Sequence, residues 1–350
     1  MNKAVTALIL TCAILAHAHA FAGCDPVDLR EALGPPRDQG ETGWCYAHTA
    51  ADLLTQAVGY RVSASAIASD FILARPQDLK KLARGKVRKH LAKNPYLLRE
   101  IEEIRSTEPD HWLDQNLFTY EKNSDINGQE HITFRGLFDI VGTESSALVV
   151  ANFYGLCASE KLPEENYVAL ADLLEERRAL NPSRREFHLR DFVAELCGTR
   201  LALPHPLLPS NLQKAKDLSA WKEIRHRTPR RAQRLQAELL ARIHTNLSKG
   251  RASAIGYDYC EHARPDAATG ECSNFSTTNG QKFYPELDHS AIVAARKPIG
   301  GNCHFFLRNS VGATCEFTHT KWQSRCEAEA GGIWVTEEEL ESLYSVVSLP

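Results

Sequence analysis

A cysteine close to the N-terminus stands in a run whose residue types suit nucleophilic chemistry. The run QGETGWCYA covers residues 39–47 and places Gln39 six positions before Cys45, with two glycines between them. From Cys45 onward apolar residues recur with the spacing of one helical face, and Gly59 follows as a natural end. A thiol at the start of a helix lies at the positive end of the helix dipole, which favours the thiolate. The pattern therefore predicts a helix over about 45–58 that carries an activated thiol.

A base and an amide that could serve this thiol occur near the other end of the chain. His289 begins the apolar run LDHSAIVAA (287–295), and a second such run, CHFFLR (303–308), leads directly into Asn309. A turn rich in glycine and proline separates the two runs, so we expect adjacent strands that bring His289 and Asn309 together. Cysteine, histidine and asparagine can act as nucleophile, base and the group that orients the base.

A second histidine is a rival for the role of base. His48 lies three residues after Cys45, one helical turn along the predicted helix. A side chain at this spacing on the same helix rarely points at a thiol at the helix N-terminus. We therefore expect His289, rather than His48, to act as the base.

Three motifs of this chain resemble those of papain-like cysteine proteases. Residues 39–46 are similar to the family signature C-G-[SA]-C-[WY] with its preceding glutamine, and the residues around His289 and Asn309 resemble the family motifs D-H-[AS] and K-N-S-W-G. The motifs occur in the family's order, and Gly256 lies in a segment that resembles a further strand of the family. The resemblance covers roughly residues 35–71, 142–163 and 235–350.

Carried over position by position, the resemblance implies a role for each matched residue. Cys45 would be the nucleophile. His289 would pair with its thiolate and later protonate the leaving amine, and Asn309 would orient the imidazole. The side-chain amide of Gln39, together with the Cys45 backbone N–H, would form the oxyanion hole.

Departures from the family pattern fall beside these residues and leave the triad intact. Thr42 replaces a family cysteine, which removes a local disulfide, and Val311 replaces a tryptophan that shields the Asn–His hydrogen bond. Trp44 stands where a small residue is usual; we expect it, together with Gly142, to contact substrate. The base follows the nucleophile by 244 residues, against about 130–150 in the family, which implies roughly a hundred inserted residues.

The resemblance implies an α+β, papain-like fold of two lobes with helical insertions. We expect a single peptidase domain over residues 23–350, with a helical lobe over about 23–235 and a β-barrel-like lobe over about 236–350. Insertions are expected at about 72–140 and 164–234, packed as helical additions on the first lobe.

The first predicted insertion contains a strongly basic segment. Residues 80–93 include seven lysines and arginines and no acidic residue. A thin apolar stripe accompanies them, formed by Leu79, Leu82, Ala83 and Leu91. The segment is interpreted as a solvated helical face, with an anionic partner or a lid over the cleft as alternatives.

Residues 1–22 have the features of a secretory signal peptide: the positive residue Lys3, a short apolar core and small residues at the cleavage position. The core is too short to span a bilayer, so we expect a secreted or periplasmic protein without a transmembrane segment. The alternative is a lipid anchor at Cys24, because FAGC (21–24) resembles a lipoprotein cleavage site. The formal net charge of −3 does not indicate a nucleic-acid partner.

Ten cysteines suit an oxidising compartment. Without Cys12, in the signal peptide, and Cys45, the number is even and permits four disulfides in 105 pairings. A bridge between Cys303 and Cys315 would flank Asn309 and stiffen the strand end. No C-x-x-C or H-E-x-x-H spacing occurs, so we expect no metal and no cofactor. The eight cysteines are Cys24, Cys157, Cys197, Cys260, Cys272, Cys303, Cys315 and Cys326.

The expected function is that of an exported cysteine endopeptidase acting on protein or peptide substrates. Family members usually carry a folded inhibitory propeptide, and the segment before Pro36 is too short for one, so a separate inhibitor protein is a possible partner. Two alternatives use the same scaffold. One is a deamidase or acyltransferase with the same triad, and the other is a non-catalytic binding protein in which Trp44 fills the cleft.

Overall fold

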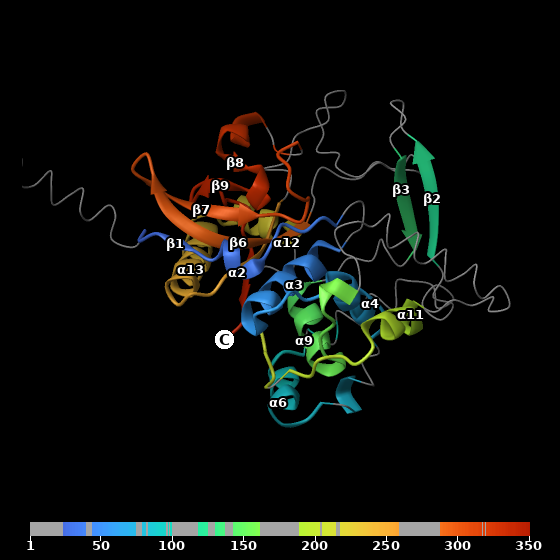
Figure 1. The fold of residues 1–350 in the computed structure, drawn as a ribbon. Helices are drawn as coiled ribbons and strands as arrows, with labels where there is room; N and C mark the ends of the chain where they lie inside the picture. Colours follow the sequence, from blue (N-terminus) through green and yellow to red (C-terminus); the bar gives the residue numbers. More distant parts are fainter. Residues whose placement is uncertain are drawn as a thin grey trace, which may run out of the picture.

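The computed structural model combines helices with an antiparallel sheet, as the sequence predicts (Figure 1). Its described helices are α2 (Arg30–Leu33), α3 (Cys45–Val58), α4 (Ala64–Leu73), α6 (Gly85–Lys93), α9 (Glu144–Tyr154), α11 (Leu189–Cys197), α12 (Leu218–Arg227) and α13 (Pro229–Ser248), with the short 3₁₀ segments η2 (Ser159–Lys161), η4 (Thr320–Arg325) and η5 (Ala328–Ala330). The structure describes residues 24–39, 44–74, 79–81, 83–95, 97, 99, 118–124, 130–136, 143–161, 189–203, 205–214, 218–258, 288–316, 318 and 320–350.

The main sheet is open and antiparallel. Its strand order is β4-β10-β5-β6-β7-β9-β8, and β1 pairs with β6 outside this path. Within the described residues the end strands β4 and β8 do not pair with each other, so the closed, barrel-like sheet that we expected is not seen. These strands are β1 (Val27–Asp28), β4 (Ser210–Gln213), β5 (Ser253–Asp258), β6 (Asp288–Ile299), β7 (Asn302–Arg308), β8 (Cys326–Glu327), β9 (Gly332–Thr336) and β10 (Ser345–Ser348).

Both faces of the sheet are covered by helices, which explains the continuous apolar stretch in the middle of β6. Along β6, Ile292 and Ala294 belong to the cluster formed with α3, α4 and α9. Ala291 and Val293 belong to the opposite cluster, formed with α13. Side chains alternate across a strand, so a strand covered on both sides shows a continuous apolar run rather than alternation. Figure 1 shows α3, α4 and α9 grouped together beside the sheet.

The helix that begins at Cys45 is confirmed at both ends. Helix α3 spans Cys45–Val58 and is followed by Gly59 in the left-handed conformation (φ 75°), whose N–H bonds to the Thr55 carbonyl. Its residues from Cys45 to Thr55 are all buried, because the helix packs against α4 and α9 as well as against strands β5 and β6. The predicted strand pair is also confirmed, as β6 and β7.

Glycine is required in the middle of β5, where the sequence singled out Gly256. A Cβ atom at this position would lie 2.5 Å from both the Tyr344 ring and the Ser345 hydroxyl. The Gly256 N–H instead donates to Ser345 Oγ at 3.1 Å. The close approach of β10 thus depends on the missing side chain.

The predicted insertions contain more than helices on the first lobe. Residues 118–136 include the two-stranded antiparallel pair β2 (Phe118–Ser124) and β3 (Glu130–Gly136). Helix α11 packs on α4 as expected, but β4 joins the main sheet beside β10. Helix α12 packs on α13 and β5, and its Trp221 donates from Nε1 to the Glu341 carbonyl at 3.2 Å. The second predicted insertion therefore packs partly on the first lobe, as expected, and partly on the main sheet, which was not expected.

The basic segment places its cations in solvent. In α6 and the residues before it, Leu79, Ala83 and Leu91 are buried, which confirms the apolar stripe for the three of its members that the structure describes. The lysines and arginines of residues 80–93 are exposed.

Three disulfides occur within the described residues: Cys24–Cys303, Cys157–Cys197 and Cys315–Cys326. The Cys303–Cys315 bridge, one of the pairings that the sequence permits, does not form, because each of these residues pairs elsewhere. In this structure the Cys24 sulfur is bonded to Cys303, so it does not carry the thioether that a lipid anchor would require. Cys260 and Cys272 lie outside the described residues.

Two further expectations fall on residues that the structure does not describe, namely the signal peptide over 1–22 and the substrate contact at Gly142. None of the described helices is both long and apolar enough to cross a membrane.

Candidate active site

His289 and Asn309 meet across the β6–β7 pair. The two atoms His289 Nε2 and Asn309 Oδ1 lie 2.6 Å apart. The Ser310 backbone N–H donates to the same Asn309 oxygen at 2.8 Å, which identifies that atom as the amide oxygen. An amide oxygen can only accept, so His289 must carry a proton on Nε2. In the neutral imidazole the basic nitrogen is then Nδ1.

The segment that carries Gln39 is bound to the segment that follows Asn309. The Gln39 N–H donates to the Ser310 carbonyl at 2.8 Å, and the Gly312 N–H donates to the Arg37 carbonyl at 2.8 Å. The Ser310 hydroxyl also donates to the Gln39 side-chain oxygen. Because that contact uses the oxygen end of the amide, the –NH₂ end of Gln39 points away from Ser310. Gln39, Ser310, Asn309 and His289 therefore form one connected set.

Ser310 is a site residue that the sequence reasoning did not assign. It lies directly after Asn309, is 6 % exposed and orients the Gln39 amide. Its only signal in the sequence is its place in the run NSVG. A serine is too common in such a turn to be singled out without its partner.

Cys45 opens α3, and α3 packs against β6, the strand that begins with His289. The residue is a thiol and is 9 % exposed. Residue Trp44 occupies the N-cap position without a side-chain capping bond. The helix N-terminus therefore offers its backbone N–H groups and the positive end of its dipole beside the sulfur.

Trp44 packs into the core. Its side chain is 2 % exposed and lies in the cluster formed by α3, α4 and α9. This position supports the chain at the start of α3 from within the fold. The substrate contact expected of Trp44 stays a prediction.

Burial controls the charge of His289. The side chain is 8 % exposed and its ring meets that of Tyr257 edge-on, with centroids 5.8 Å apart. Burial lowers the pKa of His289 from 6.5 to about 4, and the hydrogen bond to Asn309 acts in the opposite direction. An imidazolium at this position therefore requires an anion beside it, and a Cys45 thiolate would be such an anion.

The rival base His48 is held neutral. It is 3 % exposed, and burial, followed by the charges of Arg37 and Arg61, lowers its pKa from 6.5 to about 3. Burial lowers the pKa of His289 as well, so the pKa does not separate the two residues. His289 is favoured by its hydrogen bond to Asn309, which fixes one ring nitrogen and leaves Nδ1 as the basic one.

A neutral, buried His48 makes stability depend on pH. Below about 6.5 the unfolded chain binds a proton at this residue, whereas the folded chain does not until about pH 3. Stability therefore falls as the pH drops through this window. We predict that His48→Gln weakens the fall of Tm between pH 7 and pH 4, measured by circular dichroism. The exposed His226→Gln should follow the wild type; an equal fall of Tm in wild type and His48→Gln would contradict the prediction.

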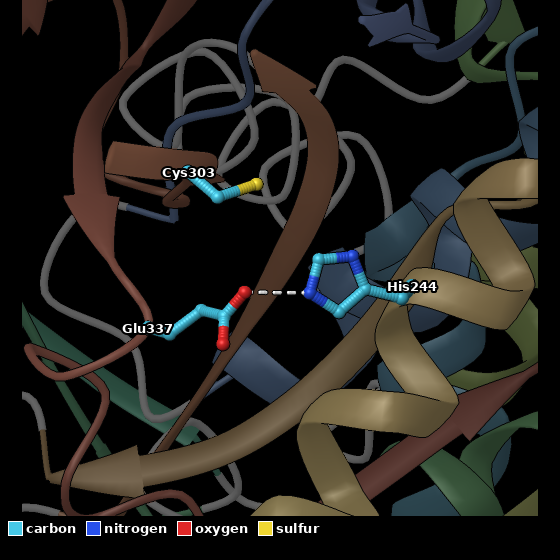
Figure 2. Close-up of side chains that lie close together, drawn as sticks. All are labelled: His244, Cys303 and Glu337. Carbon is cyan, nitrogen blue, oxygen red and sulfur yellow. Dashed lines mark hydrogen bonds and ion pairs between the residues drawn. The ribbon is translucent and has the colours of Figure 1, made fainter. Parts of the chain in front are cut away.

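His244, Cys303 and Glu337 form a cluster that could be taken for a metal site (Figure 2). Their ligand atoms lie within 4.8 Å of one another. However, Cys303 is bonded to Cys24, so its sulfur is not a thiolate ligand. Arg296 Nη1 lies 3.0 Å from His244 Nδ1 and can only donate there, which leaves the Nε2 proton directed at Glu337, 2.7 Å away. The candidate ligand atoms are therefore already used in a disulfide and in hydrogen bonds, and they do not fit a metal ion.

No protein-family model matches the chain, and no curated protein does. Among solved structures, the digestive procathepsin L 3 of the Tenebrio molitor larval midgut aligns with a TM-score of 0.38 and 12 % identity, over 93 % of this chain and 69 % of that one. The ragweed pollen allergen Amb a 11, a cysteine protease in its proform, aligns with a TM-score of 0.40 and 12 % identity, over 93 % of this chain and 64 % of that one.

Proposed function

We propose that this protein is an exported, papain-like cysteine endopeptidase with Cys45, His289 and Asn309 as its triad. The observation that carries the proposal is the His289–Asn309 hydrogen bond. It joins two side chains that the sequence selected on chemical grounds, and it leaves Nδ1 as the basic nitrogen. The position of Cys45 at the start of a helix packed on β6 supports the same assignment.

Acylation follows from this arrangement. His289 Nδ1 takes the proton of the Cys45 thiol, and the sulfur attacks the carbonyl carbon of the scissile bond. The carbonyl oxygen becomes an oxyanion, stabilised by the Gln39 amide and the Cys45 backbone N–H. The intermediate then collapses, the C–N bond breaks, and His289 gives its proton to the leaving amine.

Deacylation reverses the roles. A water molecule gives a proton to His289 Nδ1 as its oxygen attacks the thioester carbonyl. The C–S bond breaks, the acid product leaves, and the proton returns to Cys45. Throughout both steps His289 Nε2–H donates a hydrogen bond to Asn309 Oδ1, which keeps the ring in one orientation.

The pH dependence of peptide hydrolysis should be bell-shaped, because the reactive form needs both a thiolate and an imidazolium. The Asn309 bond raises the pKa of His289. We therefore predict that Asn309→Ala shifts the basic limb to lower pH and lowers kcat/KM about 10–100-fold, equivalent to the loss of one hydrogen bond to a charged group. The matched control is Asn302→Ala, at the exposed start of β7. A variant with lower activity but an unshifted basic limb would contradict this role for Asn309.

The reaction itself is tested by the products. Incubation of the purified mature protein with an unfolded protein substrate should generate new N-termini, detected by mass spectrometry, without release of ammonia. Ammonia release or transfer of the acyl group to an added amine, without new N-termini, would favour the deamidase or acyltransferase alternative. Absence of all these products would favour the binding protein.

A further inference from the structure

A buried carboxylate in the middle of α3 connects the two segments that lead into the candidate site. Asp52 Oδ1 accepts from Arg37 Nε at 2.6 Å. Asp52 Oδ2 forms an ion pair with Arg308 at 3.2 Å from Nε, an atom that makes no hydrogen bond to a described residue. The three residues are 4 %, 1 % and 3 % exposed, respectively. Arg37 lies two residues before Gln39, and Arg308 directly precedes Asn309.

The two arginines use their remaining donors to hold the chain on either side. Arg37 Nη2 donates to Thr55 Oγ1, one turn further along α3, at 3.0 Å. Arg308 Nη1 donates to the Gly34 carbonyl at 2.7 Å, and Nη2 donates to the Pro35 carbonyl. The network thus joins α3, the end of β7 and the segment before Gln39.

The carboxylate and the thiol lie on the same face of α3. Asp52 follows Cys45 by two helical turns, and this face is polar although it is buried. Its members are Cys45, His48, Asp52 and Thr55. A buried ion pair seldom stabilises a fold more than well-packed apolar residues would. The ion pairs of Asp52 therefore matter more for the positions of the segments that they join than for the free energy of unfolding.

We propose that Asp52 is a positioning residue of the candidate site. By holding Arg37 and Arg308, it fixes Gln39 and Asn309 relative to the helix that carries Cys45. The inference rests on the proposed peptidase function. It adds a role for Asp52, a residue two helical turns after the proposed nucleophile Cys45.

The first test is Asp52→Asn, which keeps the shape of the side chain but leaves two buried guanidinium groups without their counter-charge. Rates are divided by the concentration of sites titrated with an epoxysuccinyl thiol probe, so that only folded molecules with a reactive Cys45 are counted. We expect kcat to fall about 10–100-fold with KM changed less than twofold, because oriented groups act mainly in the transition state.

The chain offers a matched control in Asp70, a buried carboxylate of α4 that pairs with Arg200. Asp70→Asn should lower Tm but leave kcat per titrated site unchanged. If Asp52→Asn does not fold, Arg308→Lys replaces it, since lysine keeps the charge but cannot hold the carboxylate and both carbonyls together. We expect that variant to lose kcat in the same way.

A double-mutant cycle separates positioning from a general loss of stability. If Asp52 acts through Asn309, the effect of Asp52→Asn on kcat should shrink at least about fivefold in an Asn309→Ala background. A kcat per titrated site within twofold of the wild type, with Tm lowered as in Asp70→Asn, would overturn the inference while leaving the peptidase function standing. A wild-type protein that neither reacts with the probe nor cleaves peptides would overturn the proposed function and this inference with it.

Discussion

Cys45→Ser should reduce kcat for peptide hydrolysis by about 10⁴-fold or more. The hydroxyl has nearly the same size as the thiol, so the fold should survive. It is far less acidic than a thiol, however, so the helix N-terminus and His289 cannot convert it into a comparable nucleophile. Tm and the residual rate are measured on the same preparation, by circular dichroism and by cleavage of a fluorogenic peptide.

The partner of Cys45 should behave as part of the same unit. His289→Ala is expected to lose as much activity as Cys45→Ser, and the double variant should be no worse than either single one. The control is His226→Ala, on an exposed surface of α12. Additive losses in the double variant would mean that the two residues act independently, which contradicts a shared proton transfer.

Gln39→Ala should lower kcat by about 10²–10³-fold while KM changes little. The side-chain oxygen of Gln39 is held by the Ser310 hydroxyl, which directs the amide N–H groups elsewhere. An oxyanion forms only as the reaction proceeds, so its donor contributes to the transition state rather than to substrate binding. Steady-state kinetics with one peptide at several concentrations separate the two parameters.

A matched glutamine tests whether this loss is specific. Gln233 lies on the exposed side of α13, and Gln233→Ala should leave both kcat and KM unchanged. A rise in KM at constant kcat in Gln39→Ala would instead assign Gln39 to substrate binding.

Those parts of the fold with strong local signals could be predicted from the sequence. The helix from Cys45 to Val58 has apolar residues at helical spacing and a terminal glycine, and the structure confirms both ends. The strands around His289 and Asn309 are continuous apolar runs separated by two glycines with positive φ, Gly300 and Gly301. Local patterns of this kind do not depend on contacts with residues that are distant in the sequence.

The features that were missed depend on contacts between distant segments. Strand β4 has the sequence SNLQ, which shows no apolar alternation, and it forms only because β10 offers an edge. The disulfide of Cys303 with Cys24 is one of 105 combinations that the sequence permits. The ion pairs of Asp52 join residues far apart in the chain, and a single aspartate on an apolar helix does not reveal its partners.

Whether His289 activates the Cys45 thiol is decided by the reactivity of Cys45 toward an epoxysuccinyl thiol probe at pH 5–7. We expect rapid labelling of the wild type, mapped by mass spectrometry to Cys45 and lost in both Cys45→Ser and His289→Ala. Labelling of Cys45 at the same rate in His289→Ala, or no labelling of a wild-type protein whose Cys45 is a thiol, would contradict this activation.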